Sequence, residues 1–314
     1  MKSVDLIVPC YNESDVLDLF YKEVCSVIEK SSEYSFSFIF VNDGSRDNTL
    51  EIIENYAAND SRVKYLSFSR NFGKEAGMLA GMTYSTADYV GIIDADLQHS
   101  PELFLEMLEA VDKEGYDVAA ARRTDRKGEA KIKSAFSRRF YSVINKMSDV
   151  KIEEGAQDFR VMTQKVVRAI CSLPEYNRFS KGIFSWVGFR TKWFEHENRE
   201  RAAGQTKWSF IKLLKYAIEG IIGFSTAPLK ISFLSGMLFS VIGLLYAVYI
   251  FIDTIINGPD VAGYPSIICL IIFLGGLILV SLGIIGEYVS KIYLEVKHRP
   301  IYLIDKTNIR DDNQ

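Results

Sequence analysis

The segment YVGIIDADLQHSPE, residues 89–102, contains the signals that decide the fold. Its first residues are apolar and β-branched, as is typical of a buried strand. Ser100-Pro101-Glu102 then predicts the start of a helix, because serine is a good N-cap and proline is favoured at the first helical position. Two aspartates, Asp94 and Asp96, lie in the short turn between them. A strand that passes through a polar turn directly into a helix is a unit of an α/β fold.

The same alternation of strand and helix occurs upstream of this segment. Residues 4–9, 37–43 and 63–69 have strand composition. Helical periodicity follows each of them: over 16–28, where six apolar side chains share one face, then from about Asp47, and over 73–85. Such alternation favours a mostly parallel sheet covered by helices on both faces. We therefore predict an α/β domain.

Polar residues follow three of these strands, at the edge where open parallel sheets bind ligands. They are Pro9 to Glu13, Asn42 to Ser45, and Asp94 to Gln98. Paired carboxylates repel one another unless a cation lies between them, and hard oxygen ligands suit Mg²⁺ or Mn²⁺. Any single aspartate here could instead be a helix cap or turn residue. Three acidic strand ends together favour a site.

The composition of the chain changes sharply after residue 230. The 314 residues carry a net charge of only −3, yet residues 231–286 contain just two charged side chains, Asp253 and Asp260. The uncharged runs 231–252 and 264–286 would reach about 33–35 Å as helices, enough for a hydrocarbon core of about 30 Å. This division excludes a purely soluble enzyme, a disordered chain and a transporter with most of its mass in the bilayer. A buried hairpin in a large soluble core is the alternative.

The flanks of these runs predict the orientation. The link between them has no lysine or arginine, whereas both outer flanks are basic, so the positive-inside rule places both flanks in the cytoplasm. Residues 208–225 combine a lysine-bearing face with an apolar stripe, which predicts an amphipathic interface helix, or alternatively a core helix. The N-terminus has no signal-peptide pattern. The four cysteines form no C-x-x-C pair, so we expect neither disulfides nor a zinc site.

The quoted motifs resemble those of a known family. V-P-x-Y-N-E at 8–13, D-G-S at 43–45 and D-A-D-L-Q at 94–98 are similar to family 2 glycosyltransferases with the GT-A fold. R-N-F-G-K-E at 70–75, A-R-R at 121–123, Q-D-F-R at 157–160, R-x-x-G-x-T-K-W at 201–208 and the two spans resemble the bacterial polyprenyl-phosphate glycosyltransferases, relatives of dolichyl-phosphate mannose synthase. The resemblance covers essentially the whole chain.

The resemblance implies roles for individual residues. It implies Asp158 and Asp96 as catalytic residues, with Asp158 as the family's proposed base, and a divalent metal, Mg²⁺ or Mn²⁺, held by Asp94, Asp96 and Gln98. Asn42 stands where many relatives have a second acid, which we expect to tune ribose contacts. The implied donor-binding residues are Pro9, Tyr11, Asn12, Glu13, Asp43, Ser45, Lys74, Asp94 and Ala95.

A basic segment supports a phosphate-bearing acceptor. Residues 122–139 carry eight basic and two acidic side chains, which near a bilayer attract anionic headgroups and can clamp a lipid phosphate. A solvated loop is the alternative, and without an aromatic platform we expect no nucleic acid. The residues expected at the acceptor phosphate are Arg122, Arg138, Arg201, Thr206 and Lys207.

The resulting expectation is transfer of a sugar, with inversion, from a nucleotide-sugar that we expect to be UDP-linked to undecaprenyl or another polyprenyl phosphate. The lipid-linked monosaccharide would serve cell-envelope glycan modification. A processive polysaccharide synthase and a membrane-tethered, non-catalytic binding protein are the alternatives. The motifs do not identify the sugar.

We predict four regions for this chain: a cytosolic GT-A domain (1–206), a juxtamembrane amphipathic helix (207–229), two transmembrane helices (230–287) and a cytosolic tail (288–314). The expected location is the cell (inner) membrane, with the catalytic domain and both termini in the cytoplasm. Membrane lipids and further copies of the chain in a homo-oligomer are the expected partners.

Overall fold

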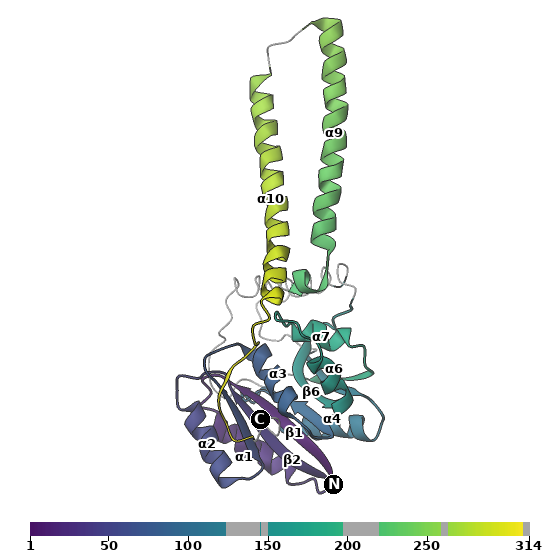
Figure 1. Ribbon diagram of the computed structural model, residues 1–314. Helices are drawn as coiled ribbons and strands as arrows, with labels where there is room; N and C mark the ends of the chain where they lie inside the picture. The colour runs from purple at the N-terminus through teal and green to yellow at the C-terminus, as the bar shows by residue number, and fades with distance from the viewer. Residues whose placement is uncertain (124–144, 146–149, 197–219, 259–262, 310–314) are drawn as a thin grey trace.

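The computed structural model describes residues 1–123, 145, 150–196, 220–258 and 263–309. The first half of the chain alternates strands and helices as the sequence predicts (Figure 1). Its elements are β1 (Lys2–Cys10), α1 (Leu17–Ile28), β2 (Tyr34–Asn42), α2 (Thr49–Asn59), β3 (Val63–Phe68), α3 (Lys74–Tyr84), β4 (Tyr89–Ile92) and α4 (Pro101–Asp112). The later elements are β5 (Val118–Arg123), β6 (Ala156–Thr163), α6 (Gln164–Cys171), α7 (Ser180–Trp186), β7 (Thr191–His196), α9 (Ala227–Asn257), α10 (Tyr264–Val296) and β8 (Ile304–Thr307).

All eight of these strands belong to one sheet, in the order β7-β5-β6-β4-β1-β2-β3-β8. The pairs among β1, β2, β3 and β4 are parallel, as is β5 with β7. Strand β6 runs antiparallel to both neighbours, and β8 runs antiparallel to β3. The fold is therefore the predicted α/β sheet, with two antiparallel strands that the sequence pattern did not forecast.

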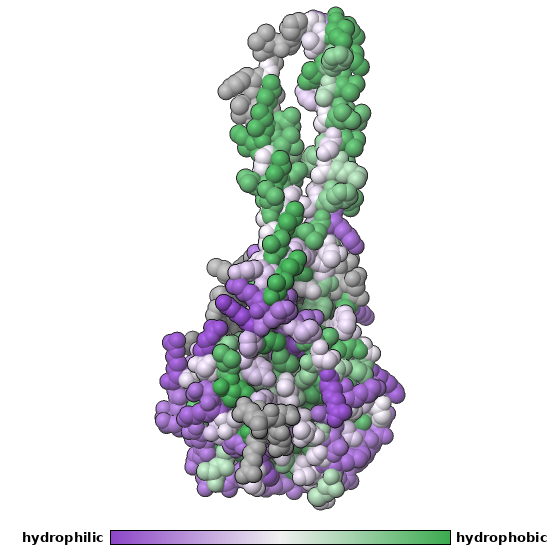
Figure 2. All heavy atoms as spheres, in the orientation of Figure 1, coloured by the Kyte–Doolittle hydropathy of each residue, from purple (hydrophilic) through white to green (hydrophobic). Residues whose placement is uncertain are grey.

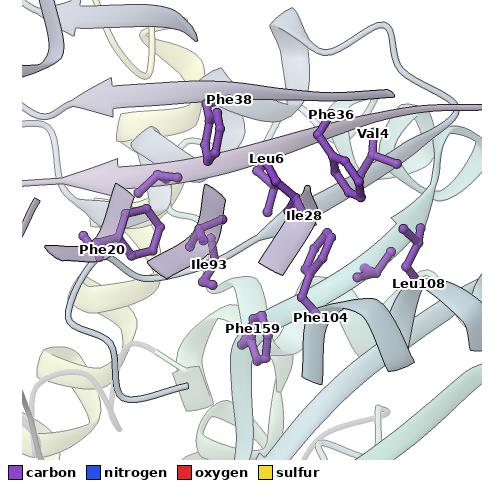
Figure 3. Packing of buried hydrophobic residues seen from close by; sticks show 14 of the residues in the cluster. Val4, Leu6, Phe20, Ile28, Phe36, Phe38, Ile93, Phe104, Leu108 and Phe159 are labelled. Atoms are coloured by element: carbon purple, nitrogen blue, oxygen red, sulfur yellow. The ribbon is translucent and has the colours of Figure 1, made fainter. Parts of the chain in front are cut away.

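Alternate residues of the central strands serve opposite faces of the sheet, as the two-residue period of a strand requires. Leu6 and Phe38 face a core that α1 and α4 cover, and Figure 3 shows Phe20, Phe104 and Leu108 packed there. Ile7 and Ile39 face the opposite core, which α3 and α6 cover. Because both faces are buried, the strands are almost continuously apolar.

Helices α9 and α10 project from the domain as a long hairpin (Figure 1). Both are long and apolar enough to cross a membrane, with mean hydropathies of 2.1 and 2.4 in their most apolar windows, and their side chains there are not buried in the protein. Figure 2 shows the apolar surface along both helices. They contain the uncharged runs 231–252 and 264–286 and extend beyond them. Of the predicted juxtamembrane helix (207–229), residues 207–219 lie outside the described part, 220–224 are helical, and 227–229 belong to α9.

The chain returns from α10 to the eight-stranded sheet. Strand β8 pairs with β3, the Ser69 amide donates to the Leu303 carbonyl at 3.0 Å, and the ring of Tyr302 stacks on Phe68 at 5.1 Å. The segments before and after the hairpin therefore belong to one folded unit.

Candidate active site

The ends of β1 and β2 are joined by hydrogen bonds between the first two polar segments. The Asn12 amide donates to Ser45 Oγ at 3.0 Å, and the Arg46 amide donates to Asn12 Oδ1 at 2.8 Å. The Glu13 amide donates to Thr49 Oγ1 at 2.9 Å. Asn12 has a positive φ of 54°, a conformation that asparagine tolerates better than most residues. These contacts place Tyr11, Asn12, Glu13 and Ser45, all predicted donor-binding residues, at one sheet edge.

Asp43 connects this edge to the start of α3. Its buried carboxylate accepts the amides of Phe72 at 2.6 Å and Gly73 at 2.9 Å. Burial raises the pKa of Asp43, and the two amides oppose that rise. Gly44 has a φ of +62°, and a Cβ there would lie 2.4 Å from the backbone of Arg70. The glycine of D-G-S is therefore required for the close approach of the loop at residues 70–73.

Asn42 has a buried, bridging position. Its Nδ2 donates to Ser67 Oγ on β3 at 2.9 Å, and its Oδ1 accepts the Ser45 amide at 3.2 Å. Both ends of the amide are used in holding β2 to β3 and in shaping the D-G-S turn. These contacts account for an amide at this position independently of any ribose contact.

The D-A-D-L-Q segment forms a tight turn after β4. Asp94, Asp96 and Gln98 are partly exposed, whereas Ala95 and Leu97 between them are buried. The Gln98 amide donates to Asp96 Oδ1 at 3.1 Å, and Leu97 has a φ of 57°. Alternate burial thus gathers the three oxygen-bearing side chains on the open side of the turn.

Lys74, in the first turn of α3, joins two carboxylates. Its Nζ lies 2.7 Å from Asp94 Oδ1 and 2.6 Å from Asp158 Oδ2. Burial disfavours the charged ammonium, but the charges of Asp158 and Asp94 outweigh it and raise the pKa of Lys74. The converse holds for Asp158: burial opposes ionisation, and Lys74 nonetheless holds the pKa of this carboxyl well below its usual range. The cluster is a charged triad at the sheet edge.

The register of the sheet explains why these two aspartates meet. Ile92 of β4 pairs with Arg160 of β6 in an antiparallel ladder. Two residues after Ile92 is Asp94, and two residues before Arg160 is Asp158, so the same register brings these two aspartates opposite one another. Two aspartates from motifs far apart in the sequence therefore face one another, and Lys74 lies between them.

The other members of Q-D-F-R support this arrangement. Gln157 Oε1 lies 3.0 Å from Nε2 of buried His99, and Phe159 is in the core. The guanidinium of Arg160 is buried, lies 3.4 Å from the ring centre of Phe184, and donates to the carbonyls of Gln157 and Asp158 at 2.7 and 3.2 Å. The motif thus fixes the backbone beside Asp158.

Two residues beside the site, His196 and Glu75, make contacts that were not predicted from the sequence. His196 on β7 lies 5.4 Å from His99, ring centre to ring centre, and its Nε2 lies 3.1 Å from the Gln98 carbonyl oxygen. Glu75, next to Lys74, accepts hydrogen bonds from the amide and the hydroxyl of Ser180 on α7. The sequence offers one signal for each of His99 and Glu75. His99 directly follows D-A-D-L-Q, and Glu75 is the last residue of R-N-F-G-K-E.

Most of the predicted acceptor-phosphate residues lie outside the described part of the chain. These are Arg138, Arg201, Thr206 and Lys207. Arg122, at the end of β5, is described. Its guanidinium donates to Glu153 at 2.8 Å and to Glu195 at 2.7 Å, so a phosphate would have to compete with two carboxylates there.

The side chains of the D-A-D-L-Q turn are of the kind that can bind a divalent metal. Two carboxylates and an amide on its open side are oxygen donors of the kind that Mg²⁺ and Mn²⁺ prefer. Within the described residues no group of three His, Cys, Asp or Glu side chains is gathered closely enough to hold a metal by itself. A metal here would accordingly need further oxygens, such as those of a diphosphate.

Comparison with known proteins agrees with this geometry. Residues 5–171 match Glycosyl transferase family 2, and residues 227–292 match the GtrB C-terminal hairpin. The chain belongs to glycosyl transferase family 2; it is a glycosyltransferase with the GT-A fold and a C-terminal hairpin of two helices apolar enough to span a membrane. Enzymes of this fold typically use a divalent metal.

Relatives match over nearly the whole chain. A bactoprenol glucosyl transferase of Shigella phage SfX is 44% identical and covers 96% of this chain and 98% of its own. A prophage bactoprenol glucosyl transferase homolog of Escherichia coli is 41% identical, again over 96% of this chain and 98% of its own. Among solved structures, mannosyl-3-phosphoglycerate synthase from Rubrobacter xylanophilus is 15% identical, with a TM-score of 0.48 over 69% of this chain and 71% of that one.

Proposed function

We propose that this protein transfers one sugar from a UDP-linked donor to polyprenyl phosphate, such as undecaprenyl phosphate, with inversion at the anomeric carbon. The observation that carries the proposal is the full-length similarity, hairpin included, to proteins named bactoprenol glucosyl transferases. The product would be a lipid-linked monosaccharide available for cell-envelope glycan modification.

The geometry of the sheet edge supports the donor half of the proposal. The ends of β1 and β2 bring Tyr11, Asn12 and Ser45 to the same sheet edge as Asp43. The other predicted donor residues, Pro9, Glu13, Lys74, Asp94 and Ala95, belong to the same edge or to the α3 start that faces it. The donor's diphosphate would then lie toward Asp94 and Lys74.

Asp94, Asp96 and Gln98 are the residues that we propose hold Mg²⁺ or Mn²⁺. A bound ion would neutralise the developing charge of the leaving diphosphate. Lys74 contributes a positive charge at the same place, since its ammonium already contacts Asp94.

The acceptor needs little activation, because a phosphate monoester has a second pKa near 6 and is mostly a dianion at neutral pH. One phosphate oxygen attacks the anomeric carbon, forming a new carbon–oxygen bond. The bond from that carbon to the diphosphate oxygen breaks, and its electron pair leaves with the nucleoside diphosphate. Protein groups therefore act mainly by position and charge.

Asp158 fits such a role better than that of a strong base. Because Lys74 holds the pKa of Asp158 low, the carboxylate is ionised at neutral pH and accepts a proton only weakly. Its charge can instead orient Lys74 and favour the positive charge that develops at the sugar ring in the transition state.

We place the acceptor at the base of the hairpin and keep Arg122, Arg138, Arg201, Thr206 and Lys207 as its proposed phosphate contacts. The apolar hairpin supports residence in the cell membrane, among membrane lipids. Basic flanks on both sides of the hairpin, together with the pairing of β8 with β3, support a catalytic domain and two termini that all lie in the cytoplasm. We also retain the expectation of a homo-oligomer.

The purified full-length chain in detergent, incubated with Mg²⁺, undecaprenyl phosphate and a panel of nucleotide-sugars, tests the proposal by mass spectrometry of the lipid. One sugar added per lipid phosphate, from one donor, is the expected result, and anomeric proton couplings report inversion. Products with repeated sugar units would instead indicate a processive synthase. Tight nucleotide binding without any glycosylated lipid would indicate a non-catalytic binding protein.

A further inference from the structure

A cavity of about 720 Å³ is lined by residues at the start of α3 and at the cytosolic end of α10. Figure 1 shows that the hairpin meets the catalytic domain at this end of α10. One wall is the loop of residues 70–73 with Glu75 and Ala76 at the start of α3, and a second is the segment of residues 175–179. A third wall comes from the last turns of α10, including Tyr288, Lys291 and Glu295. A helix that the sequence marks as a membrane span thus lines a cavity beside the catalytic cluster.

Residues of the polar wall of the cavity lie next to the charged residues of the proposed donor site. The amides of Phe72 and Gly73, both lining residues, donate to Asp43 on the donor side. Glu75 also lines the cavity, and Lys74 before it contacts Asp94 and Asp158. The segment of residues 70–76 is therefore shared: one side of it contacts residues of the proposed donor site, and the other faces the cavity.

Three cationic side chains line the cavity without an ion pair to any carboxylate in the described part of the chain. Arg70 lies over the ring of Phe72, 4.5 Å from its centre. Arg178 donates to the carbonyls of Leu173 and Ile170 at 2.8 and 3.2 Å. Within the described residues, the half-buried ammonium of Lys291 has no hydrogen-bond or ion-pair partner.

The acidic side chains of the lining do not cancel these charges fully. Burial, with the charge of Asp158, raises the pKa of Glu75 to about 7, and burial also raises the pKa of Glu175. Glu295 accepts the Tyr176 amide at 2.9 Å, which docks α10 on the catalytic domain. Arg70 and Lys291, which form no ion pair within the described residues, are therefore available to an anion in the cavity.

Part of the remaining lining is apolar, and Asn71 and Asn177 add amide groups. The apolar part includes Phe179, Ile222, Phe224, Ile292, Val296 and Ile301. A ligand that fits both kinds of wall has a phosphate at one end and a hydrocarbon chain at the other. A glycerophospholipid shares that chemistry, but its phosphate is a diester and cannot serve as the acceptor.

We infer that this cavity is an entry site, where Arg70 and Lys291 bind the phosphate of the isoprenoid acceptor before it reaches the contacts proposed above. The inference deepens the proposed function, on which the identity of the ligand rests. It assigns α10 a residue in the acceptor site, so the hairpin binds substrate as well as anchoring the domain. Strand β8 and the Glu295 contact hold Lys291 in place over α3.

Direct binding of farnesyl phosphate to the full-length protein in nanodiscs, followed by ³¹P NMR without any nucleotide-sugar, tests the inference. We expect Arg70→Ala and Lys291→Ala each to weaken binding at least tenfold, as the loss of a charge-assisted contact predicts. Lys291→Arg should retain most of the affinity. Lys297→Ala is the matched control: it removes a lysine at the same end of α10 that does not line the cavity.

A second measurement separates substrate binding from folding. With saturating donor, Lys291→Ala should raise the KM for polyprenyl phosphate at least tenfold and leave the nucleotide Kd within about threefold. Unchanged binding of farnesyl phosphate by both alanine variants would overturn the inference, as would an equal loss in Lys297→Ala. Loss of nucleotide affinity together with lipid affinity would also overturn it, because the cations would then serve the donor.

Other probes distinguish the source of the phosphate. Phosphatidylglycerol nanodiscs or inorganic phosphate that displace farnesyl phosphate at equal concentration would show a general anion site and refute an acceptor site. Farnesol should not compete. If farnesyl phosphate binds through Lys291 but no donor yields a glycosylated lipid, the proposed function fails while the cavity assignment stands. If a glycosylated lipid forms but farnesyl phosphate does not bind through Lys291, the cavity assignment fails and the proposed function stands.

Discussion

Lys74 Nζ lies 2.6 Å from Asp158 Oδ2, although the two residues are 84 positions apart in the chain. The contact exists because β6 lies antiparallel to β4, which brings Asp158 to the sheet edge that α3 faces. It unites R-N-F-G-K-E, D-A-D-L-Q and Q-D-F-R in one cluster of charges.

Replacing Lys74 should therefore cost turnover more than folding. In Lys74→Ala, Asp94 and Asp158 lose the cation between them, and the leaving diphosphate loses a positive charge. We expect kcat to fall at least a hundredfold, within the range found when one transition-state contact is removed. Lys113→Ala, which removes an exposed lysine from the far end of α4, should leave kcat unchanged. A kcat for Lys74→Ala close to that of the parent would contradict the assigned role.

The proposed metal site predicts a different pattern for Asp96→Asn. The substitution keeps the shape of the side chain but removes a charge from the ligand set, so Mn²⁺ affinity, measured by electron paramagnetic resonance with UDP present, should fall at least tenfold. Turnover should be lost and the circular dichroism spectrum retained. Asp305→Asn on exposed β8 serves as the control. Undiminished Mn²⁺ affinity in Asp96→Asn would remove that residue from the metal site.

The orientation of the hairpin is open to a labelling experiment. In a cysteine-free background, Asn257→Cys at the end of α9 should react with a membrane-impermeant maleimide added outside intact cells. Lys297→Cys, just after α10, should react only after the cells are opened. The opposite pattern would put the catalytic domain outside, away from cytosolic nucleotide-sugars.

The return of the chain to the sheet predicts a stability effect far from the catalytic cluster. Tyr302 stacks on Phe68 at 5.1 Å, so Tyr302→Ala should cost about 2 kcal/mol of unfolding free energy and lower the thermal midpoint. Leu303→Ala should change little, because that side chain is 53% exposed and only its backbone carbonyl is used. A thermal midpoint for Tyr302→Ala equal to that of Leu303→Ala would mean that the stacking of Tyr302 on Phe68 does not stabilise the domain.

The sequence predicts the parts of this molecule that depend on local pattern. Strands β1 to β4 and helices α1 to α4 follow from periodicity and from signals such as Ser100-Pro101, and the hairpin follows from two uncharged runs. The near-continuous apolar strands predict a sheet that helices cover on both faces, and the structure confirms this.

What the sequence did not predict depends on long-range pairing. Strand β8 has only four residues, one of them apolar at the pairing edge, and nothing in IDKT indicates that it joins β3. The motifs named Lys74 and Asp158 separately, but only the β4–β6 register places them in contact. The cavity combines residues from α3, the segment 175–179 and α10, which no local pattern relates.

Glu75 provides the last prediction, on stability and pH. Burial, followed by the charge of Asp158, raises the pKa of this carboxyl from 4.5 to about 7, while hydrogen bonds from Ser180 limit the rise. Because the folded state holds its proton more tightly than the unfolded state, the stabilisation is complete below about pH 4.5. It is then lost as the pH rises toward 7. Allowing for partial exposure, the loss is on the order of 2 kcal/mol.

Glu75→Gln should abolish this dependence, since glutamine keeps an acceptor for Ser180 and cannot ionise. The thermal midpoint of the variant relative to the parent should therefore rise between pH 5 and pH 8, by several degrees if unfolding of the domain is cooperative. Glu51→Gln, on the exposed side of α2, should produce a difference that is constant with pH. If the difference for Glu75→Gln is constant with pH as well, the pKa of Glu75 is the same in the folded and the unfolded protein. The Glu75 carboxylate would then be charged in the folded protein at neutral pH, contrary to this prediction.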